Sequence, residues 1–195
     1  MEAPGPIGNH RRLASVQTTV KHLSFFAVMV VVVSACAGSP QPPPEPSASA
    51  SAEVMAAALV QLITVDHTFG EGPPPFTEYL IQAKIDPFAG NPTGGERPTR
   101  PLTSEEQAAI EFALGAYGPV RWIDDPADWR TDDLLPSIEG AVILGVGEPI
   151  LNGDTALVPV SLWCGGLCGT WLTYRLDLVD GAWTVTGIEG PISIS

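Results

Sequence analysis

The sequence is poor in basic residues: 9 Lys and Arg stand against 22 Asp and Glu in 195 residues, a formal net charge of −13. Nucleic-acid-binding surfaces need clustered Lys and Arg to neutralise phosphates. Anionic membrane surfaces attract basic segments for the same reason. We therefore expect no nucleic-acid partner and no electrostatic attachment to a membrane. The length fits one medium-sized domain plus additional sequence.

Metal-ligating residues are also scarce, with 3 His and 3 Cys in the chain. Beyond residue 35 the only histidine is His67, and Cys164 and Cys168 have no second cysteine pair, so the ligand set of a structural zinc site is missing. The acidic segment 124–133 lacks the residue alternation and central glycine of an EF-hand loop. We expect no bound metal and no cofactor.

No apolar run is long enough to cross a bilayer. The longest spans residues 23–33, about half of the roughly 20 residues that a transmembrane helix needs. Basic residues, including Arg11, Arg12 and Lys21, precede this run, and the small residues Ser34 and Ala35 follow it. This order is typical of a secretory signal peptide, which we assign to residues 1–35.

The residues Val33-Ser34-Ala35-Cys36 resemble the lipobox of bacterial lipoproteins. The resemblance implies that Cys36 is acylated, for example with palmitate, and becomes the first residue of the mature protein. Several acyl chains make a stable anchor where a single chain is marginal. We therefore expect a lipid-anchored protein of the cell membrane that faces outside the cytoplasm. The alternative is an ordinary secretory signal in which Cys36 is incidental.

Residues 36–52 are rich in Pro, Ser and Ala and carry almost no apolar side chain to bury. Proline-rich sequence favours extended polyproline conformation, so this stretch is expected to be a semi-rigid tether. The remaining residues, 53–195, are sufficient for a single domain with its own core.

Two helices and several strands are expected in that domain. Residues 53–65 combine apolar residues with good helix formers. A second helix should start near Thr103 or Ser104, each of which has Glu or Gln three residues later and so fits a capping box. Residues 76–85 are a plausible strand, and Trp122 and Ile123 could begin another short one.

Turn signals set the expected register of the C-terminal third. Apolar and polar residues alternate over 172–178, which is the period of a strand with one buried face. The Asp180-Gly181 turn would place Leu178 opposite Trp183, with both side chains on the core face.

A preceding hairpin contains the two remaining cysteines. With residues 165–167 as its loop, Cys164 sits opposite Cys168 at a spacing suited to a disulfide, and Val160 pairs with Leu172. A further turn at Asn152-Gly153 would lead back to a strand over 141–144, whose apolar residues on both faces indicate cover from both sides.

These elements predict an α+β fold in which an antiparallel meander of about four strands is packed by two helices. Such a fold is similar to the cystatin-like or cone-shaped domains found in many extracytoplasmic bacterial proteins. That resemblance concerns the fold and implies no activity.

The predicted register sends Trp163, Trp171 and Arg175 to the face opposite the core. Two indoles near a hairpin tip could stack on a sugar ring or an aromatic ligand, and Arg175 would add a charge. These three residues are our candidate ligand or partner face. The alternative is that a helix covers both indoles.

No motif identifies a catalytic residue, and we assign none. The favoured function is a non-enzymatic module that binds an unidentified protein or small molecule. One alternative is a small hydrolase or isomerase with a cavity between helix and sheet, in which His67 or a carboxylate is the base. A structural protein of the cell envelope is another.

Overall fold

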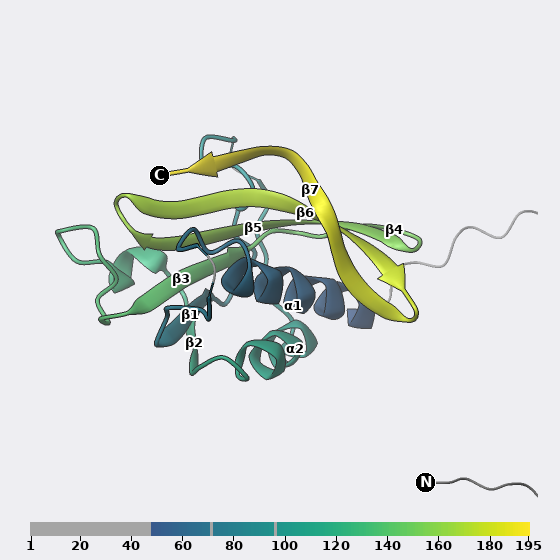
Figure 1. Cartoon of the computed structure of the whole chain (residues 1–195), viewed down its shortest axis with the longest axis horizontal. Coiled ribbons are helices and arrows are strands. Elements are labelled where there is room, and N and C mark those ends of the chain that lie inside the picture. Colours follow the sequence, from purple (N-terminus) through teal and green to yellow (C-terminus); the bar gives the residue numbers. More distant parts are fainter. Residues whose placement is uncertain (1–47, 71, 96) are drawn as a thin grey trace, which may run out of the picture. The chain divides into compact units, whose positions relative to one another are not determined.

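The computed structural model describes residues 48–195 except 71 and 96 (Figure 1). The predicted signal peptide, Cys36 and most of the predicted tether lie outside these residues. In chain order the elements are α1 (Ala48–Thr64), β1 (Glu78–Gln82), α2 (Ser104–Leu114), β2 (Val120–Ile123), the 3-10 helix η1 (Pro126–Trp129), β3 (Ala141–Val146), β4 (Ile150–Asn152), β5 (Thr155–Gly165), β6 (Cys168–Val179) and β7 (Ala182–Ile194).

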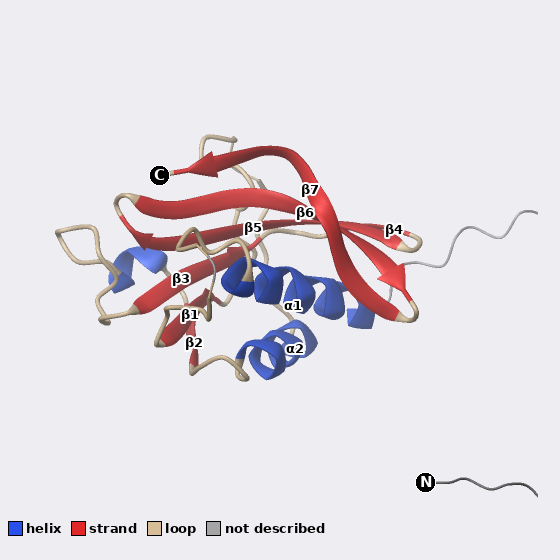
Figure 2. Ribbon diagram, in the orientation of Figure 1, coloured by secondary structure: helices blue, strands red, loops and turns tan. Residues whose placement is uncertain are grey.

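The strands form one seven-stranded mixed sheet in the order β2-β1-β3-β5-β6-β7, and β4 pairs with part of β5. The predicted α+β class is confirmed, and the antiparallel meander is present as β3, β5, β6 and β7 (Figure 2). Strand β1 lies parallel to both β2 and β3 and extends the sheet beyond the meander. The sequence predicts strands at 76–85 and near Trp122 but not their place in this sheet, because parallel pairing between distant short strands leaves no turn signal. The sheet is therefore larger than the predicted meander of about four strands.

Two of the predicted registers are confirmed. Leu178 lies opposite Trp183 across the Asp180-Gly181 turn, where both turn residues have positive φ as a tight hairpin requires. Val160 lies opposite Leu172.

The cysteine hairpin and the turn before it differ in detail from the prediction. Gly165, not Cys164, is the partner of Cys168, because the β5–β6 pairing shifts between Trp163 and Gly165. The turn therefore has two residues instead of three, and the Cys164–Cys168 disulfide forms at this irregularity with a Cα–Cα distance of 5.1 Å. The earlier turn lies at residues 153–154, one position later than predicted, and joins β5 to the short β4.

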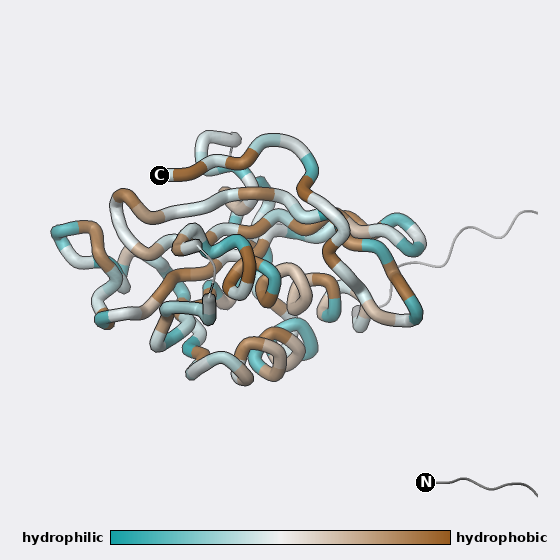
Figure 3. The backbone as a smooth tube through the Cα atoms, viewed as in Figure 1, coloured by the Kyte–Doolittle hydropathy of each residue, from teal (hydrophilic) through white to brown (hydrophobic). Residues whose placement is uncertain are grey.

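Both helices pack on the same face of the sheet, where the main hydrophobic core lies. Alternate strand residues such as Val142, Val160 and Leu172 meet Leu59 and Leu62 of α1 in this core. In Figure 3 much of α1 and β3 is brown, the colour of hydrophobic residues, and both elements contribute side chains to this core. Helix α1 begins at Ala48 instead of Glu53, since the Ala and Ser residues before Glu53 contain no helix breaker.

Strand β3 is buried on both sides, as its composition predicted. Val142 and Leu144 belong to the core under the helices, whereas Ala141 and Ile143 belong to a second cluster on the opposite face. Trp163 packs against this second cluster. The face opposite α1 and α2 is called the outer face below.

The capping box predicted at Thr103 is present at the start of α2. The Glu106 backbone N–H donates to Thr103 Oγ1 at 3.2 Å, and the Thr103 N–H donates to the Glu106 carboxylate at 2.8 Å. That carboxylate is buried and also accepts hydrogen bonds from Arg100, at 2.8 Å to each oxygen, and from Ser51 of α1 at 2.9 Å. Glu106 therefore joins the two helices and the loop before α2.

We expect Glu106→Gln to remove a pH-dependent part of the stability. Burial alone would raise the pKa of Glu106, but hydrogen bonds from Arg100, Thr103 and Ser51 outweigh it and lower this pKa from 4.5 to about 2. Because the folded-state pKa is depressed, the stabilisation is present above pH 4.5 and is lost as the pH falls toward 2. Denaturant unfolding at pH 7 should show that the free energy of unfolding of the variant is lower by about 1–3 kcal/mol than that of the wild type.

The exposed neighbour Glu105 provides the control, and Glu105→Gln should unfold like the wild type. The difference between wild type and Glu106→Gln should shrink between pH 5 and pH 2.5. A difference that stays constant over this range would contradict the role given to the ionised carboxylate.

Candidate ligand-binding site

Trp163 of β5 and Trp171 of β6 share the outer face, as predicted. Trp163 lies opposite Gly169, and Ser161 lies opposite Trp171. The two indoles are therefore diagonal neighbours across one strand pair, a spacing that aromatic side chains can bridge. Both are partly buried, and neither α1 nor α2 contributes to their surroundings; the nearby helix is η1, whose Trp129 packs with Trp163 on the same cluster.

A cavity of about 370 Å³ lies over this part of the outer face. Its volume falls at the lower end of the range of about 300–1,000 Å³ that is usual for small-molecule sites. We call it the indole pocket; its lining residues are Gln82, Lys84, Asp86, Pro87, Phe88, Pro92, Asp125, Pro126, Ala127, Arg130, Ile143, Ser161, Trp163 and Trp171. The strands and Asp86 form its floor, and the other lining residues come from the segments that follow β1 and β2.

A buried carboxylate lies on the floor of the indole pocket. Asp86 is 7% exposed and accepts hydrogen bonds from Ser161 Oγ at 2.6 Å and from the Phe88 N–H at 2.9 Å. Gly145 of β3 lies beneath the pair, and a Cβ atom at this position would collide with both the Asp86 and the Ser161 side chains. The missing side chain of Gly145 thus makes room for Asp86.

Gln82 adds a second polar group to the floor. It ends β1 on the outer face, because Tyr79 and Ile81 of the same strand point to the helix side. The residue as a whole is 7% exposed, no hydrogen bond from the described residues reaches its amide, and the amide atoms are not among the fully buried polar atoms. Its donor and acceptor are therefore free to bind a molecule in the pocket.

The charges around the indole pocket balance. The guanidinium of Arg130 lies 4.4 Å from the centre of the Trp163 ring, a cation–π contact. Lys84 is the other basic residue in the lining, and Asp86 and Asp125 are the acidic ones. In a strongly acidic chain, the pocket is thus locally neutral.

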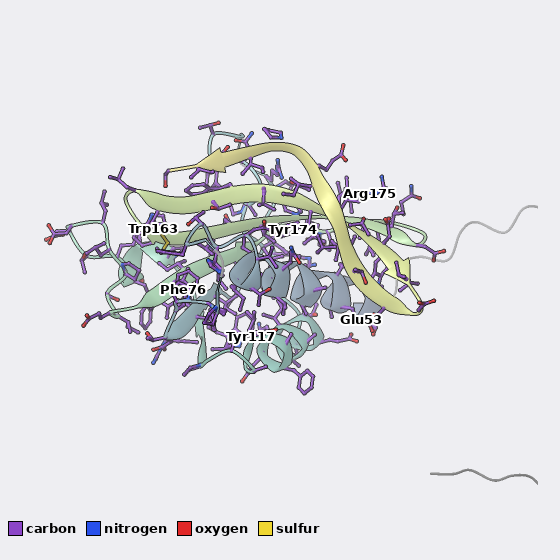
Figure 4. The ribbon with its side chains drawn as sticks, in the orientation of Figure 1. Glu53, Phe76, Tyr117, Trp163, Tyr174 and Arg175 are labelled. Carbon is purple, nitrogen blue, oxygen red and sulfur yellow. A yellow bond between two sulfur atoms is a disulfide. The ribbon has the colours of Figure 1, made fainter. Side chains whose placement is uncertain are left out.

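Arg175, the third residue of the predicted face, does not line the indole pocket. It lies opposite Leu157, farther along β6 than Trp171, and forms an ion pair with Asp177 at 3.4 Å. In Figure 4 Trp163 and Arg175 appear toward different ends of the β5–β6 pair. The structure therefore brings the two indoles together but not the arginine.

His67 lies on the helix side, away from the indole pocket. It is 1% exposed, its Nδ1 accepts a hydrogen bond from the Phe69 N–H at 3.3 Å, and its ring meets Phe76 edge-on. Nε2 is buried without a partner among the described residues. The adjacent Asp66 instead accepts a hydrogen bond from the Tyr174 hydroxyl at 2.6 Å. Burial and this carboxylate raise the pKa of Tyr174.

The disulfide holds the end of the hairpin that carries the two indoles. Cys164 follows Trp163 directly, and its bond to Cys168 closes a very short ring. By restricting the unfolded chain, a disulfide ring of this size stabilises the fold by about 2 kcal/mol. Its main consequence for the indole pocket is a fixed hairpin end.

Within residues 48–195, gaps excepted, no three His, Cys, Asp or Glu side chains lie close enough to hold a metal ion together. None of the described helices is long and apolar enough to cross a membrane.

The sequence predicted that the two indoles belong to the candidate site, but it did not indicate Gln82, Asp86 or Arg130 as members of it. A polar residue directly after the apolar run 79–81 was the one local sign of Gln82. Nothing near Asp86 or Arg130 in the sequence indicates their partners, because Asp86 meets Ser161 and Arg130 meets Trp163 only in the folded chain.

We expect Gly145→Ala to disturb the floor of the indole pocket. The added methyl group must displace Asp86 or Ser161. Overpacking of this kind lowers the free energy of unfolding by about 1–3 kcal/mol. Denaturant unfolding followed by tryptophan fluorescence measures this decrease. Gly187→Ala is the matched control in a strand, since a Cβ there meets nothing within 4 Å. Equal stability of the two variants would contradict the crowding described here.

Comparison with known proteins found no protein-family model, no curated protein and no solved structure that matches the chain.

Proposed function

We propose that this chain is a lipid-anchored, extracytoplasmic and non-enzymatic binding module whose ligand site is the indole pocket. The observation that carries the proposal is the amide of Gln82, which is open to a cavity that two indoles also line and which no hydrogen bond from the described residues reaches. Pockets for small molecules combine apolar and aromatic walls with a few polar groups that orient the ligand. The indole pocket has this composition.

The proposed anchor rests on the sequence before the described residues. The segment ending in Val33-Ser34-Ala35-Cys36 has the order of a lipoprotein signal, and a Pro-rich stretch separates Cys36 from helix α1. A net charge of −13 opposes adsorption to an anionic membrane. A lipid on Cys36 would supply the attachment that the domain's charge opposes.

A finer fold class belongs to the same proposal. Helix α1 packed along one face of the antiparallel strands supports a cystatin-like or similar cone-shaped domain. The parallel strands β1 and β2 are an addition to that pattern.

The alternatives remain hydrolase or isomerase activity and a structural role in the cell envelope. The burial of His67 among aromatic rings gives a substrate little access to this side chain. We therefore place the binding module first.

The mass of the protein isolated from membranes tests the anchor. We expect a polypeptide that starts at Cys36, carries acyl chains, and is lighter by two hydrogens because of the Cys164–Cys168 bond. A Cys36→Ala variant should keep its leader and gain no lipid. A wild-type product that retains residues before Cys36, or that has the mass of bare polypeptide, would contradict the anchor.

A thermal-shift screen of small polar molecules on the full chain in detergent tests the binding site. A ligand at 100 times its Kd should stabilise the fold by about 2.7 kcal/mol. Gln82→Met, which keeps the volume but removes the amide, should abolish most of the shift, whereas Gln107→Met on α2 should not. If no compound stabilises the protein, or if both variants keep the full shift, the indole pocket is not the binding site.

A further inference from the structure

We infer that the ligand of the indole pocket is a neutral sugar, with one pyranose ring stacked on Trp171 and its hydroxyl groups bound to Asp86 and Gln82. This inference rests on the proposed function and names the ligand class of the same site. Three properties of the indole pocket support it: the Trp171 indole, the type of hydrogen-bonding groups, and the balance of charge.

Trp171 differs from Trp163 in its stacking partners. The guanidinium of Arg130 already lies on the Trp163 ring. Among the described residues, no other aromatic ring or cation is stacked on Trp171. Its ring edge is held against Gly169, where an added Cβ would collide with two ring atoms. Trp171 is thus a fixed platform in the cavity.

A pyranose ring matches such a platform. Its axial C–H bonds form an apolar face with a small positive charge, which complements the negative face of an indole. Stacking of this kind needs a flat aromatic ring that is held in place. The contact with Gly169 holds the Trp171 ring in this way.

The polar groups of the floor match hydroxyl groups. The Asp86 carboxylate can only accept hydrogen bonds when ionised; two of its roughly four acceptor sites are used by Ser161 and Phe88, so others remain. The amide of Gln82 can both donate and accept. A sugar hydroxyl also does both, so neighbouring hydroxyls can satisfy the two groups together.

The charges of the lining disfavour an ionic ligand. An organic cation would be drawn to Asp86 but would face Lys84 and Arg130. An organic anion would be drawn to these two basic residues but would face Asp86 and Asp125. A neutral ligand rich in hydroxyl groups avoids both repulsions.

Titration calorimetry and saturation-transfer NMR on the full chain test the inference. A detergent without a sugar headgroup is required. The probes are the methyl glycosides of glucose, galactose, mannose and N-acetylglucosamine, with trimethylphenylammonium as the organic cation and benzoate as the organic anion. We expect at least one glycoside to bind and neither ion to compete with it.

Trp171→Ala and Asp86→Asn should each weaken glycoside binding at least about ten-fold, as expected for loss of a stacking platform and of a charged hydrogen-bond acceptor. The matched controls are Trp122→Phe and Asp154→Asn, which alter residues outside the pocket lining and should leave the Kd unchanged. If Trp171→Ala does not fold, Trp171→Phe should still show weaker binding, because its ring is smaller.

The outcomes separate this inference from the proposed function. If an ion binds in a Trp171-dependent way and no glycoside does, the sugar assignment is overturned while the binding site stands. If a glycoside binds but Trp171→Ala and Asp86→Asn both bind it like the wild type, the site lies elsewhere and the inference is wrong. If no probe binds at all, the sugar assignment is also overturned.

Discussion

The pleat of the central strands is the constraint on which the rest of the structure depends. Successive side chains of a strand point to opposite faces, so β5 and β6 supply Val160 and Leu172 to the core under the helices and Trp163 and Trp171 to the outer face. A slip of one residue in either strand would exchange these sets. The same register therefore determines both the stability of the domain and the existence of the indole pocket.

Around this sheet, polar contacts over long sequence distances hold the connecting segments in place. Asp86 accepts a hydrogen bond from Ser161 of β5 and so attaches the segment after β1 to the outer face. Glu106 joins α2 to Arg100 and to Ser51 of α1 on the helix side. Both carboxylates are buried, and a buried charge is tolerated only when hydrogen bonds compensate for the lost water. These contacts give the irregular segments fixed positions, which a binding cavity between loops requires.

The two faces of the sheet differ in how their polar groups are used. The indole pocket combines a fixed indole, a carboxylate with spare acceptor sites and an amide without a protein partner, while its charges cancel. Asp66 and Tyr174, in contrast, are paired with each other on the helix side. These features of the outer face support the proposed binding of a molecule outside the chain.

The sequence by itself determined the α+β class, a capping box at Thr103 or Ser104, the Leu178–Trp183 register and the common face of Trp163 and Trp171. Each depends on neighbouring residues or on one short turn, so the pattern is visible locally. Only the tertiary structure decided that β1 and β2 join in parallel, that Gln82 and Asp86 complete the floor, and that Arg175 stays outside. The reason is that these placements depend on contacts between segments far apart in the chain, such as Asp86 with Ser161, for which no local spacing gives a signal.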